Sequence, residues 1–287
     1  MESVEPAAAA APAGPGAGKL LARRVREMFR VYPKALVGAI EAVHDLRVAA
    51  RRLRSALTLF AGDPEGKRAR RADRTLGALA RAAGRSRDLD VGIDVLTELL
   101  RGDSEANERL RRALTASRAR ARSFSREELL DLDVAHLRRD LRVLVATAVG
   151  DRGILASRLV ALREREQGTI DRELAAGRAW PRPEQLHSAR RAARRLRYAS
   201  ELEDLVDGAD SGEAARWRSM QTRLGDIQDR HVFSAWLASR ERRAEKIGDL
   251  ALGTAAHRLL GRVKADAARR TREFLARRVA AKATPPD

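Results

Sequence analysis

The chain has 287 residues, 44% of them hydrophobic and only 3% aromatic, which is enough apolar material for one large domain or two small ones. Its 58 lysines and arginines against 40 aspartates and glutamates give a net charge of +18, so the expected partners are polyanions. The absence of cysteine excludes disulfides, zinc–thiolate sites and thiol nucleophiles, and no apolar run reaches the ~18 residues of a membrane span.

Alanine, leucine and arginine dominate and no strand-like alternation occurs, so we predict an all-α fold. Residues 1–18 are rich in alanine, glycine and proline, and we expect a disordered tail that is not a signal peptide. Helical spacing then covers residues 20–60, where Pro33 is a candidate start of a new segment. A second helical region covers residues 67–101, with a break expected near 87–88.

The second part of the chain contains clearer helix start and stop signals. After a helix over 105–122, the capping-box pattern that begins at Ser125 predicts a new helix start. We expect a weak break at 150–151 and a firm one at 177–183. Further helices are predicted over residues 184–207, ending at Gly208, then 211–247 and 250–281, and residues 282–287 are expected to fray.

One pattern, H-x-x-R-x-A-A-R-R-L-R, occurs twice in the chain. The copies cover residues 44–54 and 187–197, an offset of 143. At an offset of 141, a second set of positions matches: Gly84, Asp88 and Val91 with Gly225, Asp229 and Val232. Two matches in the same order predict an internal duplication, with halves of about 19–165 and 166–281 inside one domain.

On a helix, the repeated pattern makes one basic face and one apolar face. At ~100° per residue, the histidine and three arginines of each copy share an arc of about 80°, and leucines lie opposite. No acid interrupts this stripe, although like charges at such spacing destabilise a helix by ~0.2–0.5 kcal/mol per pair. The simplest alternative is a solvated basic face, but we expect an anion to neutralise the stripe. The two stripes are His44, Arg47, Arg51 and Arg54, and His187, Arg190, Arg194 and Arg197, with Tyr198 beside the second.

A second basic ridge is predicted in the first half. If residues 67–101 continue as a helix, four arginines fall within about 60° of one another. Asp226 stands where the second half would need the last of them, so the ridge is expected to be lopsided. The ridge consists of Arg70, Arg74, Arg81 and Arg85.

The matched glycines and aspartates suggest structural roles. Gly84 and Gly225 lie inside predicted helices, where glycine costs ~1 kcal/mol relative to alanine, so we expect close helix approach there. Asp88 and Asp229 are expected to pair with arginines or orient them.

The segment from Val43 to Arg54 resembles the signature of the CHAD family, the conserved histidine α-helical domain. Residues 186–198, 224–229 and 87–91 are similar to its other elements, and the likeness covers about residues 20–281. The resemblance implies two pseudo-symmetric helical bundles around a basic channel or groove, inorganic polyphosphate as ligand, and association with polyphosphate granules. It also implies that the residues of both stripes, together with Tyr198, bind the ligand.

The leading hypothesis is therefore a non-enzymatic polyphosphate-binding protein in the cytoplasm, at polyphosphate granules. We expect no cofactor, no metal and no membrane association, with granule proteins as further candidate partners. General nucleic-acid or polyanion binding is the alternative, although few aromatics disfavour single strands and no duplex-reading motif is present. An enzyme acting through histidine would need an activated nucleophile or carboxylate-held metals, and the stripes carry no acid.

Overall fold

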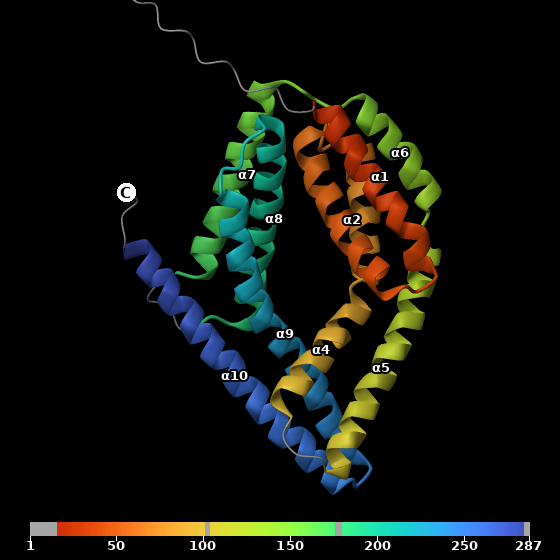
Figure 1. The fold of residues 1–287 in the computed structure, drawn as a ribbon, viewed down its shortest axis with the longest axis vertical. Coiled ribbons are helices and arrows are strands. Elements are labelled where there is room, and N and C mark those ends of the chain that lie inside the picture. Colours follow the sequence, from red (N-terminus) through yellow and green to blue (C-terminus); the bar gives the residue numbers. More distant parts are fainter. Residues whose placement is uncertain (1–15, 101–103, 176–179, 284–287) are drawn as a thin grey trace, which may run out of the picture.

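The computed structural model describes residues 16–100, 104–175 and 180–283. Within these residues the chain is helical throughout and contains no strand, which confirms the predicted fold class (Figure 1). Most of the tail predicted for residues 1–18, part of the predicted break at 177–183 and most of the end expected to fray at 282–287 lie outside the described residues. The described helices are α1 (Ala17–Leu36), α2 (Ile40–Phe60), α3 (Lys67–Ala82), α4 (Arg85–Leu99), α5 (Glu105–Leu130), α6 (Val134–Ala146), α7 (Arg152–Glu173), α8 (Pro183–Asp207), α9 (Glu213–Lys246) and α10 (Leu250–Ala283).

The helices form two groups that meet at an apex. On one side α1, α2, α3 and α6 pack together, and on the other α7 and α8 pack with the first part of α9 (Figure 1). The remainder of α9 packs with α4, α5 and α10 to form the apex. A large hydrophobic core joins the two sides and a smaller one fills the apex. None of the described helices combines the length and apolar character needed to cross a bilayer.

The two helices that carry the repeated motif bury their leucine faces as predicted. Leu46 and Leu53 of α2 are fully buried, and Leu196 of α8 is 1% exposed. Helix α8 ends where its sequence predicts, because Gly208 adopts a φ of 70° and its N–H bonds to the carbonyl of Asp204. Burial of the leucine side fixes the rotation of both helices and so determines where their basic sides point.

Three predicted helix boundaries are wrong. Pro33 lies inside the last turn of α1 and starts no segment; the chain turns instead at Gly38, whose φ of 85° suits glycine. Helix α3 ends before Gly84, earlier than the break expected near 87–88. Ser125 caps nothing, since it is buried within the continuous helix α5, whose N-terminus is capped by Ser104.

A network of ion pairs fastens the apex. The Arg230 side chain of α9 is 5% exposed, and it donates to Asp266 of α10 at 2.5 Å and to Glu98 of α4 at 2.6 Å. Arg270 donates to the same two carboxylates at 2.9 Å each. These pairs hold the pKa of Asp266 below its usual range, although burial opposes that shift. The network therefore ties three helices together around one buried guanidinium.

We expect Asp266→Ala to lower the free energy of unfolding by about 3–5 kcal/mol, because it leaves the buried Arg230 without its short ion pair. Glu273→Ala is the matched control on the same helix. It removes an exposed pair with Arg269 and should cost less than about 1 kcal/mol. Chemical denaturation followed by circular dichroism measures both, and equal losses would show that the network adds nothing beyond surface pairing.

Candidate polyanion-binding site

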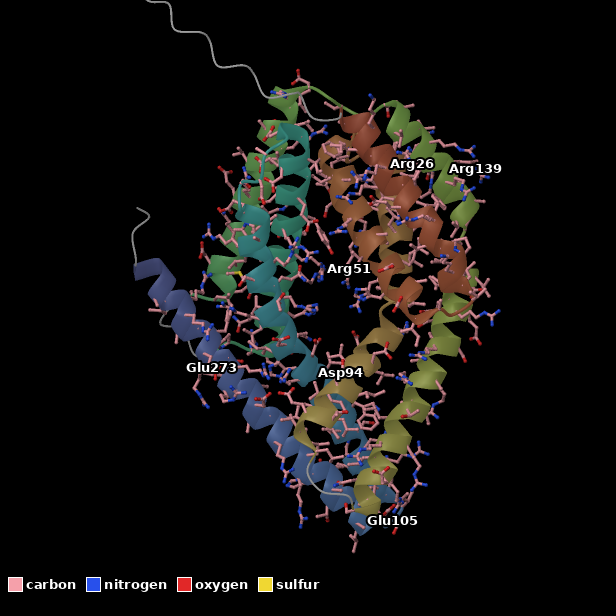
Figure 2. All side chains as sticks on the ribbon, viewed as in Figure 1. Arg26, Arg51, Asp94, Glu105, Arg139 and Glu273 are labelled. Carbon is pink, nitrogen blue, oxygen red and sulfur yellow. The ribbon has the colours of Figure 1, made fainter. Side chains whose placement is uncertain are left out.

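The basic sides of α2 and α8 face each other. Arg51 points from α2 toward α8 (Figure 2), and it lies within electrostatic range of Arg190 and Arg194. Arg47 likewise lies within range of Arg190. We call these four side chains, two from each copy of the motif, the arginine cluster: Arg47, Arg51, Arg190 and Arg194.

Burial and mutual repulsion strain the cluster. Burial, followed by the charges of Arg51, Arg190 and Arg47, lowers the pKa of Arg194 to about 8. Burial and repulsion lower the pKa of Arg51 to about 10. Both groups keep their proton at neutral pH, since a guanidinium is among the strongest bases in proteins. The folded chain therefore carries like charges in a poorly solvated place, which an anion would relieve.

Few carboxylates compensate the cluster. Asp88 lies 3.5 Å from Arg47, which confirms the predicted pairing, and Asp229 also attracts that guanidinium. Among the described residues, no carboxylate lies within ion-pair distance of Arg51, Arg190 or Arg194. The buried Nε atoms of Arg47 and Arg190 have no hydrogen-bond partner among the described residues.

The matched glycines lie against matched arginines. A Cβ atom on Gly84 would lie 3.3 Å from Cζ of Arg47, and one on Gly225 would lie 3.5 Å from Nε of Arg190. Gly225 is inside α9 as predicted, whereas Gly84 is the N-cap of α4. The close approach that we expected between helices is therefore, at both positions, an approach of a guanidinium to a helix backbone.

The third arginine of each stripe already has a carboxylate partner. Arg54 donates two hydrogen bonds to Asp73 of α3, at 2.7 and 2.8 Å. Arg197 lies 3.4 Å from Glu201 and stacks on the Tyr198 ring at 4.4 Å. Both stripes are thus neutralised at this position, and an anion would compete there with a carboxylate of the protein.

Tyr198 is less accessible than its position beside the stripe suggested. The residue is 4% exposed, with Arg197 over its ring and Arg52 5.8 Å from the ring centre. Glu201 holds both arginines, since Arg52 lies 3.2 Å from it. This buried clamp between α2 and α8 was not foreseen, although the four-residue spacing of Arg197 and Glu201 is a recognisable ion-pair signal.

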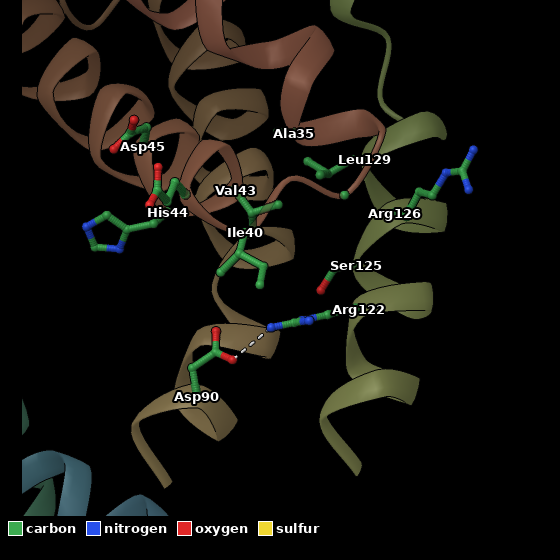
Figure 3. Close-up of a pocket in the computed structure, with 12 residues that line it drawn as sticks. Ala35, Ile40, Val43, His44, Asp45, Asp90, Arg122, Ser125, Arg126 and Leu129 are labelled. Carbon is green, nitrogen blue, oxygen red and sulfur yellow. Dashed lines mark hydrogen bonds and ion pairs between the residues drawn. The ribbon is translucent and has the colours of Figure 1, made fainter. Parts of the chain in front are cut away.

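The two histidines of the motif lie in different surroundings. His187 is half-buried, and burial together with Arg190, Arg191 and Arg194 lowers its pKa. His44 is exposed and lines the mouth of a pocket of about 340 Å³ between the start of α2, α4 and α5 (Figure 3). His187 therefore belongs with the arginine cluster, whereas His44 lines a pocket that none of the four cluster arginines lines.

The predicted second ridge is only partly present. Arg74 and Arg81 are exposed on α3, and Arg81 lies close to Arg54 across Gly77. The placement of Arg85 on the ridge is wrong, because α3 ends before it and the ridge assumed one continuous helix. Its guanidinium instead pairs with Glu128 of α5 at 2.8 Å. Arg70 is exposed, with its closest carboxylate, that of Glu65, 4.0 Å away.

A model of the CHAD domain matches residues 19–238. The chain belongs to the CHAD domain family. PptA from Streptomyces chartreusis has a similar structure, with a TM-score of 0.66 and 20% identity over 92% of this chain and 99% of that one. The CHAD domain from the plant Ricinus communis gives 0.58 and 21%, over 93% and 94%. At these identities the two structures show the shared fold alone.

No curated protein matches this CHAD domain. The family match ends within α9. Helix α10 therefore lies beyond the matched residues, as does the part of the ion-pair network that α10 contributes. Within the described residues, no group of three or more histidine, aspartate or glutamate side chains is placed to hold a metal ion.

We expect Arg194→Met to stabilise the free protein by about 1–4 kcal/mol, because it removes a buried like charge and keeps an apolar stem of similar length. Arg191→Met is the control, since Arg191 is exposed on the same helix and should change stability by less than about 0.5 kcal/mol. Urea denaturation of the two variants without added anion tests this. A loss of stability in Arg194→Met would mean that the cluster is not strained.

Proposed function

We propose that this CHAD domain binds inorganic polyphosphate between α2 and α8 without altering it chemically. One observation carries the proposal: two helices turn partly buried arginines toward each other, and three of the four have no carboxylate at ion-pair distance among the described residues. Family membership supports the ligand, because polyphosphate binding is a known property of CHAD domains.

The chemistry of guanidinium groups suits a phosphate chain. Each arginine presents a planar set of donors, and charge-assisted bonds to phosphate oxygens are about twice as strong as neutral ones. A buried donor without a partner costs about 1–3 kcal/mol, and the Nε atoms of Arg47 and Arg190 are such donors. A ligand with many oxygens along its length would supply acceptors to both helices together.

The arrangement favours an unbranched phosphate chain over nucleic acid. Stacking of bases needs accessible aromatic rings, and the ring closest to the cluster, Tyr198, is buried under arginines. Duplex DNA is a wide ligand, better suited to an outer face than to two helices that face each other. General nucleic-acid or polyanion binding stays the alternative, and competition at equal charge separates the two.

Binding without hydrolysis, and a place at polyphosphate granules in the cytoplasm, complete the proposal. Asp88, the carboxylate at the cluster, pairs with Arg47. Granule association needs no separate signal, because a protein with this ligand accumulates wherever the ligand is dense. Granule proteins then become candidate partners through proximity.

Competition is the direct test. Labelled long-chain polyphosphate is bound at roughly physiological salt, where nonspecific attraction is weakened, and duplex DNA, RNA and polyglutamate are titrated in at equal charge. We expect polyphosphate to resist all three, and Arg51→Glu with Arg194→Glu to reduce affinity at least ~100-fold, since two reversed charges each cost about 1.4 kcal/mol or more.

The control for that variant is Arg191→Glu with Arg216→Glu, which makes the same charge change at exposed positions of α8 and α9. Displacement by DNA or RNA would favour the alternative function. Release of orthophosphate that disappears in His44→Ala, His187→Ala would contradict binding without catalysis.

The pH dependence of binding follows from His187. Its pKa is lowered in the free protein, and a bound anion raises it again, so binding takes up a proton. Affinity should therefore increase as the pH falls from about 8 to 6. His187→Gln should flatten this dependence, whereas His44→Gln, at an exposed position, should change it less. Fluorescence anisotropy at several pH values measures the slopes, and identical slopes in wild type and His187→Gln would show that His187 does not titrate with the ligand.

A further inference from the structure

The outer side of α1 carries a second basic stripe that the repeated motif does not include. Five exposed cations recur at intervals of three or four residues and share an arc of about 80°, over about 22 Å of helix. Glu27 is the acid beside them, and it pairs with Arg23 and Arg24. The stripe consists of Lys19, Arg23, Arg26, Arg30 and Lys34.

Helix α6 packs beside α1 and widens this stripe. Its exposed arginines are Arg138, Arg139 and Arg142, and they line an open groove of about 480 Å³ that Tyr32 of α1 also borders. Arg138 lies 4.3 Å over the ring of Phe29. Figure 2 shows Arg26 and Arg139 on this same outer side. We call the five cations of α1 and the three arginines of α6 the outer basic face.

Most of this face has no counter-charge. Among the described residues, no carboxylate lies within 4.0 Å of Arg26, Arg30, Arg138 or Arg142. The carboxylate of α6 itself, Asp140, is taken by Arg71 at 2.7 Å. The outer basic face is therefore a concentrated positive surface, not a set of intrahelical ion pairs.

The outer basic face and the arginine cluster point in different directions. Leu20, Leu21 and Met28 of α1 are buried in the core that α2 shares, so the cations of α1 turn away from α2. The arginine cluster extends from the other side of α2, toward α8. Two basic surfaces thus lie on opposite sides of the layer formed by α1 and α2.

We propose that the outer basic face binds a second segment of inorganic polyphosphate, so that one protein molecule cross-links phosphate chains; the choice of ligand rests on the proposed function. An extended polyanion matches a row of cations about 22 Å long. Base stacking is disfavoured here, because Phe29 lies under Arg138 and Tyr32 is only partly exposed. Helix α1 also exposes no large hydrophobic side chain that would insert into a membrane.

Two sites on one rigid body have a measurable consequence. A long polyphosphate chain can bind several protein molecules, and each of these can join it to a second chain. Avidity then produces large assemblies, whereas a short chain occupies one site at a time. Cross-linking should therefore depend on chain length and on both basic surfaces. Affinity for short chains should depend mainly on the arginine cluster.

The test compares two charge-matched triple variants of the full chain. Arg26→Glu, Arg30→Glu, Arg142→Glu reverses the outer basic face. The control, Arg258→Glu, Lys264→Glu, Arg272→Glu, reverses three exposed cations of α10 that have no ion pair in the described residues. Light scattering with long-chain polyphosphate reports cross-linking, and calorimetry with short-chain polyphosphate reports affinity and stoichiometry. Circular dichroism verifies that each variant keeps its helical content.

We expect the outer-face variant to need roughly tenfold more protein for the same scattering, while its highest-affinity short-chain binding changes less than about twofold. The α10 control should scatter like wild type. Scattering by the outer-face variant equal to that of wild type, or an equal loss in the control, would overturn the inference. So would an outer-face variant that keeps its scattering but loses binding to vesicles rich in phosphatidylserine.

The two proposals fail in different ways. If Arg51→Glu with Arg194→Glu leaves short-chain affinity unchanged while the outer-face variant loses cross-linking, the central site is wrong and the outer one stands. If the central variant abolishes short-chain binding and the outer-face variant still cross-links, the outer site is wrong and the central one stands.

Discussion

Confinement of four guanidinium groups between α2 and α8 is the constraint on which the rest of the structure depends. Two helices that turn like charges toward each other repel, so each must be held from behind. The leucine faces of α2 and α8 do this, because α1 and α3 cover one and α7 and α9 cover the other. At one end of each stripe, Asp73 and Glu201 neutralise the third arginine of each copy, so the repulsion is limited to the first two arginines of each copy.

Backbone shape contributes to the same confinement. A guanidinium can approach the backbone closely only where no side chain intervenes, and Gly84 and Gly225 provide that at matched places. Arg47 and Arg190 each meet such a glycine, Arg51 and Arg194 are each partly buried without an ion pair in the described residues, and Arg54 and Arg197 each face a carboxylate. The internal duplication itself stays a prediction from the sequence. The histidines depart from it, since His44 is exposed and His187 is half-buried.

The sequence predicted most of what depends on local periodicity and little of what depends on contacts between helices. The end of α8 at Gly208 and the break before α7 were foreseen, because glycine and Asp151 act through their own backbone neighbourhood. Ser125 has the residue types of a helix start, yet packing keeps α5 continuous through it. Arg85 left its expected ridge because α3 ends early. Asp73, nineteen residues from Arg54, carried no sequence signal that it would bind that arginine.

The candidate ligand residues are therefore unequal, although the motif presents them alike. Binding free energy is a difference between bound and free states, so an arginine that gives up a carboxylate to take a phosphate gains little. Arg54 and Arg197 are in that position. Arg51, Arg190 and Arg194 exchange repulsion for attraction, and each gains both terms. A carboxylate added beside them would stabilise the free protein and would weaken anion binding by a similar free energy. For the proposed anion binding, the shortage of acids around Arg51, Arg190 and Arg194 is thus a physical requirement, and Glu201 links α2 and α8 away from these three arginines.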